Sequence, residues 1–136
     1  MEITVTQAHG RVPVNILHLS GRIDASNYQT VVDRAKQLYD GGARDLLLDL
    51  SEVSFISSAG IVALHRTALL FRGERVEEEE TGWNAIHAID RDQSAGTQEH
   101  VKLFNPSPDV DRTLELVGFK GYFDFFTELD QGVSAF

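Results

Sequence analysis

Two adjacent serines, Ser57 and Ser58, are the residues of this sequence best placed to take part in chemistry. They follow an apolar segment and precede apolar residues that recur at helical spacing, so they fall at the start of a helix. The first turn of a helix has free backbone N–H groups and the positive end of the helix dipole. These donors would stabilise a phosphate on either serine, which makes the pair a candidate phosphorylation site. The alternative is that the serine only caps the helix.

A strand, a loop and a helix must position these serines. The apolar run at 46–48, followed by Asp49 and Leu50, predicts a strand buried on both faces of a sheet, as in a parallel α/β arrangement. Ser51-Glu52 predicts a short polar turn after it, and Asp49 is interpreted as a carboxylate that stabilises this turn. Apolar spacing predicts a helix at about 59–71, with His65 and Arg66 on its other side and His65 exposed.

The rest of the chain alternates strands and helices. Strands are predicted at 3–7 and 14–19 as a hairpin, and at 101–104 and 122–126; helices are predicted at about 27–41, 108–117 and, as a short tail, 131–136. A hairpin followed by alternating elements predicts an α/β fold in which helices pack on one sheet.

The segment Asp49–Ile61 reads DLSEVSFISSAGI. It resembles the D-L-S/T-x-V-x-F-[ILM]-D-S-[SAT]-G-[LIV] motif of STAS domains, most closely the bacterial anti-sigma factor antagonists. Gly21–Asp24 is similar to the family's GxLD-type loop, and Val101–Gly118 to its late V-x-L…G run. The resemblance covers nearly the whole chain. It implies a single domain, 1–136, with a mixed sheet of about five strands, an N-terminal hairpin and three to four helices.

The resemblance also implies a function and its residues. The family's phosphorylated residue falls on Ser58, but Ser57 replaces the Asp that usually precedes it, so Ser57 stays the alternative. The unphosphorylated family member binds an anti-sigma factor, often itself the serine kinase, and the sigma factor is released for transcription. Phosphorylation reverses this, and a protein phosphatase resets it. The implied partner-binding residues are Asp24, Ser57, Ser58, Ala59 and Gly60.

Asp24 has two interpretations. It is either an aspartate that stabilises the loop before the helix or a recognition residue for the partner. The resemblance implies that its loop and the Ser58 loop lie at the same end of the sheet. Other STAS-like domains serve as scaffolds of stress-signalling complexes or as accessory subunits of lipid-transport ATPases, and these roles remain alternatives. A purely structural role, without phosphorylation, is the third.

Composition excludes several other classes. A formal net charge of −9 argues against direct nucleic-acid binding, because phosphate contact needs clustered Lys and Arg. No apolar run approaches the length of a membrane span and the first residues do not resemble a signal peptide, so a cytoplasmic location is expected. There is no cysteine, and the five histidines lack ligand spacing. The serines are not in a G-x-S-x-G elbow, so we expect neither an enzyme nor a cofactor.

The segment at about 72–100 does not fit the family, which joins the flanking helix and strand by a few residues. It is interpreted as an acidic insertion, because it contains four consecutive glutamates, at 77–80. Its composition favours a solvated loop. The alternative is a short amphipathic turn at 82–90, in which Trp83, Ile86 and Ile89 pack on the domain or on a partner.

Overall fold

The computed structural model describes residues 1–74, 89 and 97–136. Within these residues five strands form one sheet in the order β1-β2-β3-β4-β5. They are β1 (Glu2–His9), β2 (Pro13–Ile23), β3 (Leu46–Ile56), β4 (Val101–Phe104) and β5 (Phe125–Phe126). β1 and β2 form an antiparallel hairpin, whereas each later strand is parallel to its neighbour. The predicted mixed sheet with an N-terminal hairpin is confirmed.

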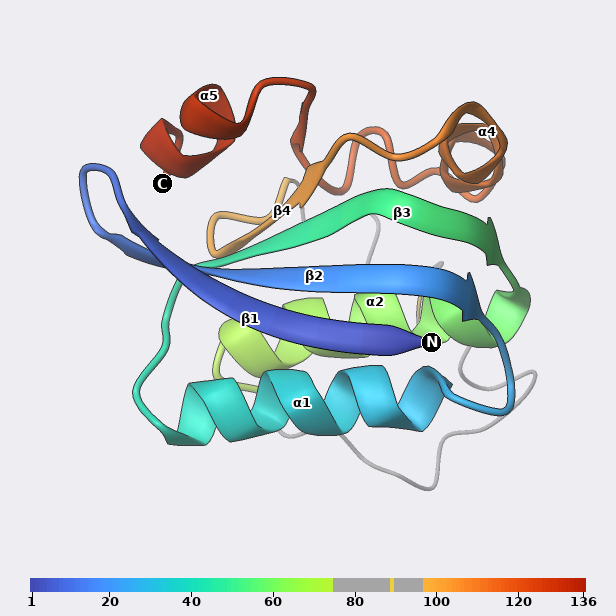
Figure 1. The fold of residues 1–136 in the computed structure, drawn as a ribbon, viewed down its shortest axis with the longest axis horizontal. Helices are drawn as coiled ribbons and strands as arrows, with labels where there is room; N and C mark the ends of the chain where they lie inside the picture. The colour runs from blue at the N-terminus through green and yellow to red at the C-terminus, as the bar shows by residue number, and fades with distance from the viewer. Residues whose placement is uncertain (75–88, 90–96) are drawn as a thin grey trace.

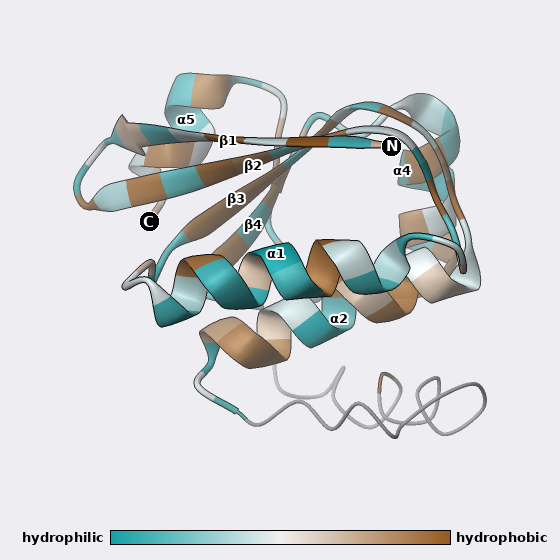
Figure 2. Ribbon diagram, turned by 60° about the horizontal axis from the view of Figure 1, so that its bottom comes forward, coloured by the Kyte–Doolittle hydropathy of each residue, from teal (hydrophilic) through white to brown (hydrophobic). Residues whose placement is uncertain are grey.

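The helices cover both faces of this sheet (Figures 1 and 2). Among the described residues they are α1 (Tyr28–Asp40), α2 (Ser58–Phe71), α4 (Pro108–Leu116) and α5 (Leu129–Ser134). α1 and α2 run side by side along one face, and α5 lies on the opposite side (Figure 1). The predicted helices at 27–41, 59–71 and 108–117 therefore exist, with ends shifted by a residue or two. The tail helix begins earlier than predicted.

The leucine run at the start of β3 joins the two layers of the core. Leu46 and Leu48 are fully buried in the main apolar cluster, which contains residues of α1 and α2. Leu47 points the other way, into a smaller cluster with Val14, Ile16 and Val133 of α5. This arrangement follows from the alternation of side chains along a strand, and it is the strand buried on both faces that the sequence predicts.

The predicted turn at Ser51-Glu52 is wrong, because β3 continues unbroken to Ile56. Glu52 pairs with Ser20 of β2, and Ser51 lies where the register shifts between His18 and Ser20. Such an irregularity lets one strand take an extra residue while pairing continues. Val53, which follows these two polar residues, is buried. Ser51 and Glu52 therefore lie within β3 and do not mark its end.

The predicted last strand at 122–126 is wrong in its first half. Only Phe125–Phe126 pairs with β4, while Tyr122 and Phe123 lie in a turn. Both rings are buried with Phe119, and the three ring centroids lie 4.9–5.5 Å apart. A compact aromatic cluster, and not a strand, therefore accounts for the aromatic composition of this segment.

The prediction that His65 is an exposed residue of its helix is wrong as well. His65 and Arg66 are each only 4 % exposed. The His65 ring lies 5.9 Å from the Tyr122 ring, and the Arg66 guanidinium lies 6.0 Å from the Tyr28 ring of α1. α2 is buried on both its sides because α1 and the C-terminal aromatic cluster enclose it.

The predicted insertion at 72–100 and the amphipathic turn at 82–90 lie mostly outside the described residues. Ile89 is described, and it is buried in the main apolar cluster. The boundaries of the insertion and its role remain a prediction.

Candidate functional site

The candidate site lies where two parallel strands, β2 and β3, end side by side. Ile23 pairs with Ile56 at the ends of these strands, and the Ser57 N–H donates to the Ile23 carbonyl over 2.9 Å. The chain then continues from β2 into Asp24 and from β3 into Ser57 and α2. The parallel pairing therefore brings the Asp24 loop and the two serines to the same end of the sheet.

The two serines have different surroundings. Ser57 is the N-cap of α2, with extended backbone, and its Oγ accepts a hydrogen bond of 3.4 Å from the Gly60 N–H. Ser58 is the first residue of the helix and its side chain is exposed. The cap interpretation thus applies to Ser57, whereas Ser58 is the exposed serine of the pair.

Gly60 lets the first turn of α2 approach the two strand ends closely. A Cβ at this position would lie 2.5 Å from Ile56 Cγ1 and 3.0 Å from the Ile23 carbonyl oxygen. Real Cβ atoms almost never come within 3.0 Å of other heavy atoms, so the Ile56 contact could not be kept. Gly60 is itself buried. Because it has no side chain, the first turn of α2, with Ser57 and Ser58, packs directly against the strand ends.

Asp24 organises the loop between β2 and α1. Its carboxylate accepts hydrogen bonds from the Ser26 hydroxyl and the Ser26 N–H, and its carbonyl accepts the Tyr28 N–H. The Ser26 hydroxyl and N–H hold the pKa of Asp24 below its usual value, and the positive charge of Arg22 acts in the same direction. The loop-stabilising interpretation of Asp24 is therefore seen directly, and its charged carboxylate lies in a loop at the same end of the sheet as the serines.

Sequence reasoning missed an aromatic and a cation at the same end of the sheet. Arg22 of β2 pairs in register with Phe55 of β3, and its guanidinium lies 4.4 Å from the Phe55 ring centroid. Phe55 is 41 % exposed, which is unusual for a large apolar side chain in a central strand. The available signal was its place in the DLSEVSFISSAGI segment, only three residues before Ser58.

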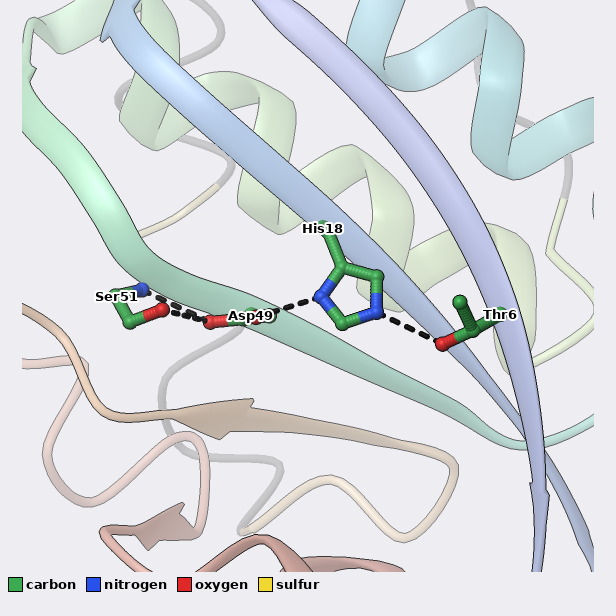
Figure 3. A network of polar contacts seen from close by, with 4 residues as sticks. All are labelled: Thr6, His18, Asp49 and Ser51. Atoms are coloured by element: carbon green, nitrogen blue, oxygen red, sulfur yellow. Dashed lines mark hydrogen bonds and ion pairs between the residues drawn. The ribbon is translucent and has the colours of Figure 1, made fainter.

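A second polar cluster crosses three strands (Figure 3). It lies on the face that carries α5, because His18 and Asp49 are two residues beyond Ile16 and Leu47, which pack near α5. The Thr6 hydroxyl lies 2.8 Å from His18 Nε2, and His18 Nδ1 lies 2.6 Å from Asp49 Oδ2. Asp49 Oδ1 accepts from both the N–H and the hydroxyl of Ser51. The prediction that Asp49 stabilises a turn is therefore wrong: it joins β3 to β2, and through His18 to β1.

The described residues contain no group of three or more His, Asp or Glu side chains that could hold a metal ion. None of the described helices is long and apolar enough to cross a membrane.

Comparison with known proteins identifies the family. The profile of the STAS domain matches residues 4–77, which is more than half of the chain and includes the whole candidate site. The chain belongs to the STAS domain family. No curated protein sequence matches it.

The fold of this STAS domain is also that of several solved structures. An anti-sigma factor antagonist from Mycobacterium paratuberculosis has a TM-score of 0.64 at 20 % identity, with 98 % of this chain and 93 % of that chain covered. Bacillus SpoIIAA in its phosphorylated form gives 0.59 at 14 %, with 96 % of each chain covered. Unphosphorylated SpoIIAA, an anti-sigma factor antagonist, gives 0.51 at 13 %, covering 96 % and 91 %. At such identities the likeness is one of fold.

Proposed function

We propose that this STAS domain is an anti-sigma factor antagonist that is controlled by phosphorylation of Ser58. When Ser58 is unphosphorylated, the domain binds an anti-sigma factor with serine kinase activity, and the sigma factor bound by that protein is released. Phosphorylation of Ser58 by the same kinase ends the binding, and a separate phosphatase restores it. The domain is thus a regulated binding module and not an enzyme.

The exposure of Ser58 at the first position of α2 is the observation that carries the proposal. The neighbouring hydroxyl of Ser57 is occupied as the N-cap, so Ser58 is the better acceptor of the two. A phosphate there would lie at the positive end of the helix dipole, where an anion is stabilised. A protein with the same fold, Bacillus SpoIIAA, has a phosphorylated form, which supports control by phosphorylation.

The surface around Ser58 suits a protein partner. Asp24 supplies a negative charge beside the serines, and the half-exposed Phe55 supplies an apolar contact next to the cation of Arg22. A phosphate adds nearly two negative charges at neutral pH. At the interface this charge would add to that of Asp24 and repel acidic groups of the partner. It would also leave polar groups of the partner buried without good hydrogen-bond partners. Binding would therefore be lost on phosphorylation.

The test is a binding experiment with charge-matched variants. Wild type, Ser58→Ala, Ser58→Asp and Ser134→Asp are immobilised and exposed to cytoplasm of the source organism, and retained proteins are identified by mass spectrometry. Ser134 is an exposed residue of α5, at the opposite end of the sheet from the start of α2 (Figure 1). Its variant carries the same added charge as Ser58→Asp but leaves the proposed surface intact.

The proposal predicts that an anti-sigma factor with a kinase domain is retained by wild type, Ser58→Ala and Ser134→Asp, and is lost with Ser58→Asp. If all four proteins retain the same transporter subunit or scaffold protein, the antagonist function is wrong and an accessory role replaces it. If Ser134→Asp loses the partner as completely as Ser58→Asp, net charge and not Ser58 controls binding.

A further inference from the structure

The strand β1 leaves one edge of the sheet open. β1 is eight residues long and stands first in the strand order, so among the described residues only β2 pairs with it. Figures 1 and 2 show it running along the border of the sheet. Natural proteins protect such edges with Pro, Lys, bulges or very short strands. β1 reads EITVTQAH and pairs with β2 without a register shift, so it has none of these protections.

The hydrogen-bonding phase of β1 follows from its neighbours. The Asn15 N–H donates to the Asp45 carbonyl, so the backbone of Asn15 faces β3 and not β1. Gln7 lies opposite Asn15, and the backbone N–H and C=O of Gln7 therefore point to the open edge. Because these groups alternate along a strand, the backbone N–H and C=O of Ile3 and Val5 also point to the open edge. The same alternation makes His9 and Pro13 a pair without backbone hydrogen bonds between them, which agrees with the missing N–H of Pro13.

We propose that this edge binds a second copy of the chain, β1 against β1 in antiparallel orientation, with the two-fold axis at Val5. The outward groups of Ile3, Val5 and Gln7 would then bond those of the second copy, joining the two sheets into one. In this register Val5 lies opposite the second Val5, and Ile3 opposite the second Gln7. The same register places Thr4 opposite the second Thr6, and the paired side chains lie on the same face of the sheet.

Self-complementarity selects a second copy as the occupant. The register places Val5 opposite Val5 and Thr4 opposite Thr6, and both are favourable cross-strand pairs. The only acidic residue of the strand, Glu2, falls opposite Ala8, so no like charges face each other. The net charge of −9 on each chain still opposes association over longer distances. The dimer should therefore be weak and should strengthen as added salt screens this repulsion.

Two variants of Gln7 distinguish the contribution of its backbone N–H to association from that of its side chain. Gln7→Pro removes one outward N–H and leaves the hydrogen bonds to β2 intact, since proline is tolerated where an edge N–H faces solvent. Gln7→Ala keeps that N–H and loses the same side-chain bond to Asn15, so it is the matched control. Circular dichroism checks that both variants fold. Sedimentation equilibrium at low and high salt, over a wide range of protein concentration, measures association.

Amide hydrogen exchange of the wild type gives a second readout. In the dimer the amides of Ile3, Val5 and Gln7 should become slow to exchange as concentration rises, while those of Thr4 and Thr6 should be slow at every concentration. We expect a salt-strengthened dimer for wild type and Gln7→Ala and a monomer for Gln7→Pro. A wild type that stays monomeric overturns the proposal. So does a dimer whose three outward amides exchange freely, because another surface then forms it.

Discussion

Replacement of Gly60 by alanine tests whether the site depends on close packing of α2 against the strand ends. Gly60 is buried in the first turn of α2, and an added Cβ would lie 2.5 Å from Ile56 Cγ1, 3.0 Å from the Ile23 oxygen and 3.1 Å from Ile23 Cγ2. The Ile56 side chain can rotate, but the Ile23 carbonyl belongs to the paired backbone of β2. That carbonyl also accepts the Ser57 N–H. The helix start must therefore move away from the sheet.

The size of the effect is the difference of two terms. Adding a methyl group to a packed core destabilises by about 1–3 kcal/mol. Alanine in place of glycine inside a helix stabilises by about 0.5–1 kcal/mol, and less in the first turn. We therefore expect Gly60→Ala to lower the free energy of unfolding by about 1–2 kcal/mol. The displaced Ser58 should also become a poorer kinase substrate and partner ligand.

Urea unfolding followed by circular dichroism measures this change. The matched control is Gly121→Ala, because a Cβ on Gly121 meets nothing within 4 Å. Its free energy of unfolding should stay within about 0.5 kcal/mol of wild type or rise slightly. If Gly60→Ala is as stable as wild type while Gly121→Ala behaves as expected, the packing argument for the position of the serines is refuted.

Three further predictions concern the same end of the sheet. Ser57→Ala should lower the free energy of unfolding by about 0.5–1 kcal/mol through loss of the N-cap, while Ser58→Ala leaves it unchanged; urea unfolding distinguishes them. Ser26→Ala should raise the pKa of Asp24 toward its usual value, as followed by NMR titration. Because the folded-state pKa is depressed, the stabilisation tied to it is present above pH 3.8 and is lost as pH falls through the folded-state pKa, so Ser26→Ala should flatten this acid dependence. Phe55→Ala should weaken partner binding in calorimetry with little loss of stability, since 41 % of Phe55 is already exposed; full affinity would place the interface elsewhere.

The central strand and the helix after it were predictable because their signal is local. The three leucines at 46–48 have no polar break, and the apolar residues after Ser58 recur at helical spacing. The end of β3 was not predictable in the same way. Ser51 and Glu52 have turn-like character, but Asp49 binds Ser51 on the strand and β2 supplies an irregular register that keeps the pairing. Tertiary pairing decided the outcome there.

The environment of α2 and the pairing of Arg22 with Phe55 depend on contacts that no local pattern encodes. His65 and Arg66 look like a solvent face in sequence, yet a distant turn around Tyr122 and the first turn of α1 enclose them. Arg22 and Phe55 are distant in sequence and meet only because β2 and β3 pair in register. The serines themselves were predictable, but which of them caps the helix required the position of Ser57 relative to Gly60.

The most direct test of the central claim is to map the phosphorylated residue and follow binding in one reaction. The captured anti-sigma kinase and ATP are added to wild type, Ser57→Ala and Ser58→Ala, with intact-mass measurement, tandem mass spectrometry and size exclusion on the same samples. The account predicts a single phosphate on Ser58 in wild type and Ser57→Ala, with the complex dissociating as it accumulates. Ser58→Ala should stay unmodified and bound. Phosphate on Ser57, or a phosphorylated domain that remains in the complex, would contradict it.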